Sequence, residues 1–286
     1  MSTDEARQCL APRPPARQPA QRLPAGTVDT HFHVFKPGAP LTSPRSYTPQ
    51  VLTLADWQEL GALLGIDRGV LVQPSVYGFD NSVLLEALAV DPDRLRGIVV
   101  LPTDTPLAEL RRLDALGVRG VRINTRNKGG LPLEAVADFA AALRALDWTL
   151  QFQVNPEHLP AITKLVPELG CRMVLDHLGF IAPDGPQTPG QLDNLRRLLD
   201  TGHAYVKLSA PYRLSQNRDP AGFAGIAGSL VQSHPDRLLW GSDWPHTELW
   251  ADMPDEIDLV EDALGWLNND AIARTVFVDT PRSLFF

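Results

Sequence analysis

The chain has 286 residues, and its 26 Lys and Arg against 34 Asp and Glu give a formal net charge of −8 at pH 7. This excess of acidic groups opposes binding to nucleic acid and to anionic membranes, so we expect neither as a partner. With 44% hydrophobic and 21% charged residues, no secretory signal and no apolar run of membrane-spanning length, the composition is typical of a soluble globular protein.

Residues 1–25 are rich in proline, interleaved with Ala, Arg and Gln. This composition buries little apolar surface and favours extended backbone. We therefore predict a tail over residues 1–25 that is extended or disordered, followed by one domain over residues 26–286. Of the two cysteines, Cys9 lies in this tail and Cys171 far from it. A disulfide framework is not expected, and a reducing cytoplasm fits best.

After the tail, short apolar runs typical of strands buried on both faces alternate with segments of helical spacing. The expected strands are Thr27–His33, Gly69–Gln73, Gly97–Leu101, Gly117–Ile123, Thr149–Val154, Arg172–Asp176, Ala204–Leu208 and Arg237–Trp240. Helical spacing is clearest at Leu54, Trp57, Leu60, Leu63 and Leu64, and again at Val83, Leu84, Ala87 and Leu88. No Gly-rich phosphate turn follows the first strand, so the α/β pattern predicts a closed (β/α)8 barrel rather than an open doubly wound sheet.

Polar side chains stand at the carboxyl ends of these strands, where such a barrel carries its active site. Residues two apart in a strand share a face, so His31 and His33 point the same way. Asp243 follows the last strand, which neighbours the first in a closed barrel, and His177 follows the sixth. A carboxylate beside imidazoles is suited to take a proton from water. The sequence therefore predicts an enzyme with these four residues as its catalytic group.

Basic residues gather at the same mouth. Arg122 ends the fourth strand, Arg126 and Lys128 lie in the Gly-rich loop after it, and Arg213 follows the seventh strand. Because arginine binds carboxylates in bidentate geometry, we expect a small anionic substrate. Arg126 and Lys128 are equally compatible with a solvated loop.

Five stretches carry a family resemblance. They are Val28-Asp29-Thr30-His31-Phe32-His33-Val34-Phe35, Val72-Gln73-Pro74-Ser75, Arg119-Gly120-Val121-Arg122-Ile123-Asn124, Val174-Leu175-Asp176-His177-Leu178-Gly179 and Trp240-Gly241-Ser242-Asp243-Trp244-Pro245-His246. In order and spacing they resemble the amidohydrolase superfamily, in the branch that contains 2-pyrone-4,6-dicarboxylate lactonase and related sugar-lactone and muconolactone hydrolases.

The resemblance implies a hydrolase that opens a carboxylated lactone. Asp243 would activate water, and His31, His33 and His177 would polarise the carbonyl or orient the water. The expected substrate contacts are Arg122, Arg213, Tyr47, Ser75, Lys128, Arg126, Gln153 and His246.

The expected cofactor is none. Metal-dependent relatives usually supply Lys or Glu from the fourth strand and His from the fifth, whereas this chain has Arg122-Ile123-Asn124 and Gln151-Phe152-Gln153 there. The lactonase branch is likewise metal-independent. The alternative is one divalent ion, Zn or Mn, held by His31, His33, His177 and Asp243.

Other functions stay open on the same barrel. A lactone isomerase, for example one acting on an aldarolactone, could use the same base on a substrate hydroxyl, and a decarboxylase is a further option. A catalytically silent barrel that only binds a ligand is the non-enzymatic alternative. Glu248 lies beyond the last motif, near the position where the dicarboxylate lactonase has an Asn, so the identity of the lactone is open. Homo-oligomerisation is also open.

Overall fold

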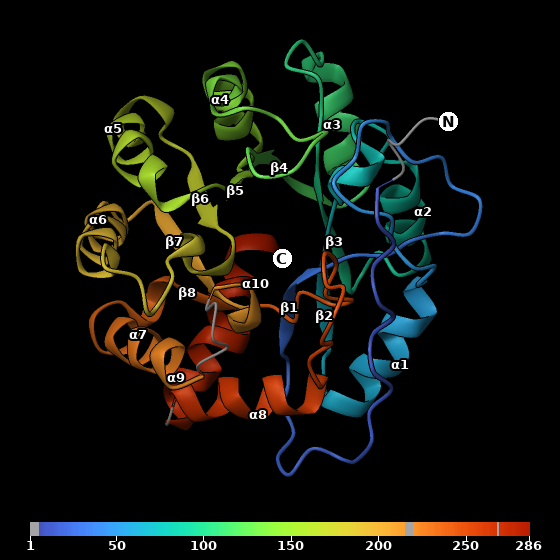
Figure 1. Cartoon of the computed structure of the whole chain (residues 1–286). Helices are drawn as coiled ribbons and strands as arrows, with labels where there is room; N and C mark the ends of the chain where they lie inside the picture. The colour runs from blue at the N-terminus through green and yellow to red at the C-terminus, as the bar shows by residue number, and fades with distance from the viewer. Residues whose placement is uncertain (1–5, 215–219, 268) are drawn as a thin grey trace.

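The computed structural model describes residues 6–214, 220–267 and 269–286. Eight parallel strands form one sheet in chain order, surrounded by helices (Figure 1). The strands are β1 (Val28–Phe32), β2 (Arg68–Val72), β3 (Leu95–Val99), β4 (Val118–Asn124), β5 (Thr149–Gln153), β6 (Arg172–Leu175), β7 (Ala204–Leu208) and β8 (Leu238–Trp240). The predicted (β/α)8 barrel and all eight of its strands are confirmed.

Helices follow the strands, and all but the last pack on the outside of the barrel, whereas the last lies across its lower end. They are α1 (Leu54–Leu64), α2 (Ser82–Val90), α3 (Leu107–Ala115), α4 (Val136–Leu146), α5 (Leu159–Leu169), α6 (Thr188–Asp200), α7 (Pro220–Ser233), α8 (Glu256–Leu267), α9 (Asp270–Arg274) and α10 (Thr280–Phe285). The first has clear local signals at both ends. The Asp56 carboxylate accepts hydrogen bonds from the backbone N–H and hydroxyl of Thr53, and Gly65 ends the helix in the left-handed conformation.

The barrel closes through residues 241–244, which continue β8 and pair with β1. The backbone N–H of Asp243 donates to the His31 carbonyl at 2.8 Å, and that of His33 donates to the Trp244 carbonyl at 2.8 Å. A buried carboxylate, that of Asp29, reinforces the closure: it accepts from the backbone N–H and the hydroxyl of Ser242 at 2.9 and 2.7 Å. The closure fixes where His31, His33 and Asp243 lie relative to one another.

The barrel interior has an apolar lower layer and a polar upper layer. The apolar layer is closed from below by Leu284 and Phe285 of α10, and its strand residues are Val28, Val70, Val72, Ile98, Val174 and Leu239. Above it, charged and amide side chains of β4 to β7 are buried. Burial of charge is costly unless every group is paired, so this upper layer marks the functional end of the barrel.

The N-terminal segment from residue 6 runs along the mouth of the barrel. The backbone N–H of Cys9 donates to the Thr48 carbonyl at 2.8 Å, and that of Leu10 donates to the Leu249 carbonyl at 2.9 Å. Further along, the Arg17 guanidinium pairs with Asp258 and Glu261 of α8. These contacts hold the segment against loops that border the site.

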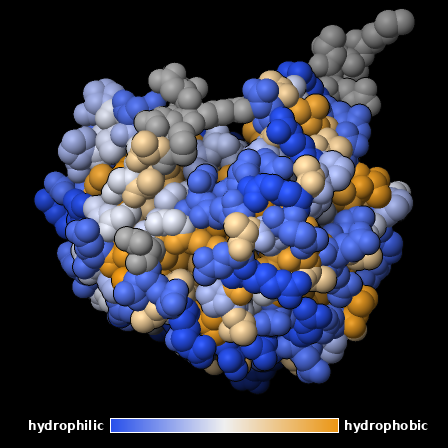
Figure 2. Space-filling view, turned by 90° about the horizontal axis from the view of Figure 1, so that it is seen from below, coloured by the Kyte–Doolittle hydropathy of each residue, from blue (hydrophilic) through white to orange (hydrophobic). Residues whose placement is uncertain are grey.

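The face seen in Figure 2 is mostly hydrophilic, with hydrophobic residues scattered over it. Among the described residues, no helix has the length and apolar character needed to cross a membrane.

Close approach of the last strand to the first explains the glycine after β8, and it yields a stability prediction. A Cβ at Gly241 would lie 2.7 Å from the His31 Cβ and 2.9 Å from its backbone nitrogen. We expect Gly241→Ala to lower the free energy of unfolding by about 1–3 kcal/mol, measured by urea denaturation, because the closure must open. Gly265→Ala is the matched control, since its Cβ meets nothing within 4 Å and alanine favours the helix. Equal stability of the two variants would contradict this account of the closure.

Candidate active site

A small cavity lies at the carboxyl ends of the strands. Its volume is about 20 Å³, which is room for about one water molecule. The predicted site residues that line it are His33, Tyr47, Ser75, Arg122, Gln153, His177, Arg213 and Asp243. His31 lies directly beneath, against Asp243 and His177. The topology therefore brings nine of the twelve predicted residues together from distant parts of the chain.

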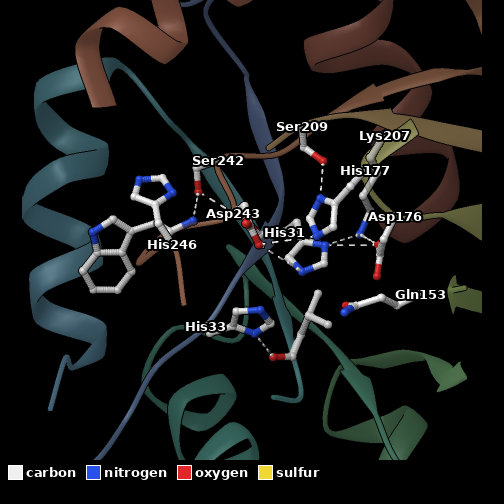
Figure 3. Close-up of polar contacts among 12 residues, drawn as sticks. His31, His33, Gln153, Asp176, His177, Lys207, Ser209, Ser242, Asp243 and His246 are labelled. Atoms are coloured by element: carbon white, nitrogen blue, oxygen red, sulfur yellow. Dashed lines mark hydrogen bonds and ion pairs between the residues drawn. The ribbon is translucent and has the colours of Figure 1, made fainter. Parts of the chain in front are cut away.

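Asp243 is the centre of this group (Figure 3). Its Oδ1 lies 3.8 Å from the His31 Nε2 and 3.6 Å from the His177 Nε2. Its Oδ2 accepts hydrogen bonds from the Arg213 Nε at 2.7 Å and the Tyr212 hydroxyl at 2.6 Å. Arg213 and the imidazoles hold the pKa of Asp243 well below its usual range, although burial alone would raise it. One carboxylate oxygen is thus anchored, and the other is directed at the imidazoles.

The backbone around the site is held in an unusual conformation. Asp243 has φ 61° and His177 φ 50°, both in the left-handed region that non-glycine residues rarely adopt. Such conformations cost about 1–3 kcal/mol each and persist where the surrounding structure imposes them. Here they turn both side chains toward the same point.

A second buried carboxylate, Asp176, organises the floor. Its Oδ1 lies 3.1 Å from both the Lys207 Nζ and the His31 Nδ1. Its Oδ2 accepts from Arg122 at 3.1 Å and from the Gln151 amide at 3.2 Å. These cationic neighbours keep the pKa of Asp176 well below its usual range despite complete burial. One carboxylate thereby fixes side chains from four strands.

Three histidines of the site, His31, His33 and His177, are neutral at physiological pH because burial lowers their pKa values. Burial is the main cause that lowers the pKa of His33 to about 3 and that of His177 to about 4. The His33 Nδ1 lies 2.7 Å from the Val72 carbonyl oxygen, which only accepts, so Nδ1 carries the proton. His177 contacts the Ser209 hydroxyl through its Nδ1 at 2.8 Å, and its Nε2 faces Asp243. The imidazoles can therefore polarise a carbonyl without adding charge.

The two arginines have buried partners. The Arg122 guanidinium bonds Asp176 twice, the Gln73 carbonyl and the Gln153 amide oxygen. Within the described residues these contacts use four of its five N–H groups, and one remains for a ligand. Arg213 pairs with Asp243, and its Nη1 lies 4.0 Å from a Glu248 carboxylate oxygen.

Three predicted residues do not line the cavity. Lys128 is exposed, and the exposed Arg126 stacks its guanidinium 3.7 Å from the centre of the Phe180 ring. His246 is buried behind Asp243, between Tyr212 and Glu256.

Sequence reasoning missed several contributors, which are Tyr212, Asn127, Thr247, Glu256 and the anchoring roles of Asp29, Asp176 and Lys207. The position of Tyr212 directly before Arg213 was the available signal for it.

Comparison with known proteins places the chain in a family. The model of the amidohydrolase family matches residues 28–286. The chain belongs to the amidohydrolase family. A 4-sulfomuconolactone hydrolase of Rhizobium radiobacter is 35% identical, covering 97% of this chain and 95% of its own length. A D-galactarolactone isomerase of Agrobacterium fabrum is 30% identical over 93% of both chains.

Among solved structures, a similar one is a probable 2-pyrone-4,6-dicarboxylic acid hydrolase of Acinetobacter baumannii with citric acid bound. It has a TM-score of 0.80 and 28% identity, and the match covers 91% of this chain and 99% of that one. The family and branch that the five sequence stretches resembled are thus confirmed.

Some donor atoms of this amidohydrolase have the spacing of a metal site. Among the described residues, one ligand atom each from His31, His177 and Asp243 lies within 4.8 Å of the others, and the buried His31 Nε2 has no hydrogen-bond partner. His33, the fourth expected ligand, is not part of this group. The three would fit one divalent ion, which would polarise a substrate carbonyl. Two cations oppose it, because Lys207 contacts His31 and Arg213 neutralises Asp243.

The neutral imidazoles yield a pH prediction for stability. As the pH falls from 6.5 to about 4, His33 and His177 become protonated in the unfolded chain but stay neutral in the folded protein. The free energy of unfolding therefore falls as the pH falls. At pH 5 each of the two histidines lowers the free energy of unfolding by on the order of 1–2 kcal/mol relative to pH 7. Asp29 acts in the opposite direction, because burial raises its pKa to about 6, but it is a single group.

We expect the urea midpoint to be lower at pH 5 than at pH 7, and the difference to shrink in the double variant His33→Gln, His177→Gln. A midpoint that is unchanged or higher at pH 5 would show that these imidazoles are not held neutral.

Proposed function

We propose that this amidohydrolase is a lactonase that opens the ring of a carboxylated lactone by attack of water, with Asp243 as the general base. The observation that carries the proposal is the position of the Asp243 Oδ1, which faces two neutral imidazoles at a cavity bordered by two arginines. The relatives support the substrate class, since their names are those of lactone hydrolases and a lactone isomerase.

The reaction follows from the charges of the site. Asp243 takes a proton from water, and the water oxygen attacks the lactone carbonyl carbon. The negative charge that develops on the carbonyl oxygen is stabilised by the Nε2–H groups of His31 and His177, whose rings are buried and fixed before the reaction. When the tetrahedral intermediate collapses, the ring C–O bond breaks, and the ring oxygen takes the second proton of the attacking water and leaves as a hydroxyl. The first proton of that water stays on Asp243.

A carboxylate of the substrate would also activate the base. In the structure Arg213 donates to Asp243, and this pairing makes Asp243 a weak proton acceptor. A substrate carboxylate bound by Arg122 and Arg213 competes for the same guanidinium. Binding would therefore raise the basicity of Asp243 at the moment when water must be deprotonated.

The remaining lining residues favour a substrate with both carboxylate and hydroxyl groups. Tyr47, Ser75 and Gln153 offer neutral hydrogen-bonding groups, and Glu248 disfavours a second carboxylate next to it. A sugar-acid lactone such as an aldarolactone satisfies these conditions. The cavity holds about one water, so loops at the mouth must shift to admit such a ring. We place the protein in the cytoplasm, in the breakdown of aromatic or sugar acids.

Isomerisation of a lactone is the second candidate, because a galactarolactone isomerase is 30% identical to this chain. A substrate hydroxyl would then replace water as the nucleophile. Reaction in ¹⁸O-labelled water separates the two: hydrolysis places the label in the product carboxylate, whereas direct isomerisation does not. A panel of carboxylated lactones with no turnover by the folded protein would instead favour a binding barrel.

Removing the base tests its role. We expect Asp243→Asn to lower kcat by about 10²- to 10⁴-fold, because water activation is lost, and not to raise KM, because Arg213 no longer pairs with an ionised Asp243 and stays available to the substrate. Steady-state kinetics on a lactone that the native protein turns over gives both constants. Asp200→Asn, which removes an exposed acid at the end of α6, is the control. Near-native turnover by Asp243→Asn would remove this residue from the mechanism.

A required metal is not part of the proposal, since Lys207 and Arg213 already supply positive charge at the candidate ligands. After exhaustive chelation, we expect full activity and no stoichiometric metal by elemental analysis. Loss of activity that zinc or manganese restores would assign His31, His177 and Asp243 to an ion instead.

A further inference from the structure

Behind Asp243, a line of three hydrogen bonds leads away from the reaction cavity. The Tyr212 hydroxyl lies 2.6 Å from the Asp243 Oδ2 and 2.8 Å from the His246 Nδ1. The opposite nitrogen of that ring, Nε2, lies 2.7 Å from the Glu256 Oε2. His246 and Glu256 are 1% and 4% exposed, so both are enclosed by protein. The proposed hydrolysis uses none of Tyr212, His246 and Glu256.

The two groups in the middle of the line can each pass a proton on. The Tyr212 hydroxyl can accept a proton at its oxygen while it gives up its own, and the His246 imidazole can accept one at Nδ1 while it gives one up at Nε2. The line therefore joins Asp243 to Glu256 through groups that both take and release a proton.

The outer end of the line opens into a second cavity. Its volume is about 500 Å³, against about 20 Å³ at Asp243. His246 and Glu256 line it, together with the N-terminal prolines Pro12, Pro14 and Pro15 and with Leu60 of α1. Within the described residues, the second carboxylate oxygen of Glu256, Oε1, is buried and has no hydrogen-bond partner. An unpaired carboxylate oxygen beside a cavity of this size is suited to exchange a proton with water.

We propose that Tyr212, His246 and Glu256 form a proton relay that carries the proton taken from water at Asp243 to the second cavity. The inference rests on the proposed function, because hydrolysis of a lactone to a carboxylate releases one proton that must leave a closed site. The three residues do not touch the substrate, and they act through Asp243.

The transfer balances atom by atom. It starts with His246 protonated at Nε2, with Glu256 ionised and with the water proton on Asp243. The Asp243 carboxyl group, which the substrate has released from Arg213, turns about its Cβ–Cγ bond and brings that proton from the Oδ1 position to the Oδ2 position beside Tyr212. The Asp243 proton moves to the Tyr212 oxygen as the Tyr212 proton moves to Nδ1, and the Nε2 proton moves to Glu256. Asp243 is then ionised again, Tyr212 and His246 stay neutral, and Glu256 passes its proton to water in the cavity.

Chemical rescue separates a relay from a structural role. We expect His246→Ala to lower kcat about 10- to 100-fold and to leave KM for the lactone within twofold, because no substrate contact is removed. Imidazole enters the second cavity and restores kcat in a saturable way, and the solvent deuterium isotope effect on kcat rises in the variant without imidazole. His234→Ala is the control. It also removes a contact between a histidine and a carboxylate, since the His234 Nε2 lies 3.0 Å from the Asp200 Oδ1, but this pair lies far from the mouth of the barrel.

Glu256→Gln is the second variant, for the case in which His246→Ala does not fold. Glutamine keeps the shape of the side chain but cannot carry the proton. We expect it to lose kcat to a similar extent with KM unchanged. A kcat within twofold of the native value in either folded variant would overturn the relay, as would a loss that imidazole leaves unchanged. If the native protein itself turns over no lactone, the proposed function fails rather than the relay alone.

Discussion

Burial of the Asp29 carboxylate between the first and last strands is the constraint on which the rest of this structure depends. It accepts from two groups of Ser242, from the backbone N–H of His31 and from the Trp57 indole. Even with four donors, burial raises its pKa to about 6. Loss of any of these donors would leave a buried charge with an unmet hydrogen bond, which is costly. The carboxylate therefore fixes the register in which β1 meets the chain after β8. That register sets the distance from Asp243 to His31.

The site above this closure is built by balancing charges rather than by accumulating one sign. Asp176 is shared by Lys207 and Arg122, and Asp243 is paired with Arg213. The imidazoles between them are neutral. In the proposed reaction an anionic lactone can use the remaining N–H group of Arg122, but it can take Arg213 only by loosening the bond of that arginine to Asp243. The proposed reaction thus couples substrate binding and activation of the base through the guanidinium of Arg213.

Much of the architecture could be predicted because its signals are local. Apolar runs and helical spacing are properties of neighbouring residues, and the alternation of the two leaves few folds other than a closed barrel. The shared face of His31 and His33 follows from strand geometry alone. Once the barrel is known, Asp243 must meet them, because the first and last strands are adjacent.

Pairing between side chains could not be predicted in the same way. The sequence indicates that Arg213 and Asp243 reach the same mouth, but not that one neutralises the other. His246 follows Asp243 by three residues, yet its ring turns behind the site to Glu256, where no spacing rule applies. Arg126 lies in a basic loop, and its stacking on Phe180 depends on the left-handed turn after β6. Such pairings depend on which polar groups the tertiary fold buries next to one another, because a buried polar group is costly unless it finds a partner.

The most direct test of the account is a crystal structure of the protein with the hydroxy acid product of a carboxylated lactone bound. We expect the carboxylate formed from the lactone carbonyl to lie within hydrogen-bond reach of the His31 and His177 Nε2 atoms and beside the Asp243 Oδ1. The original carboxylate of the ligand should contact Arg122 and Arg213. A product that binds outside this cavity, or that reaches these side chains only through a metal ion, would contradict the account.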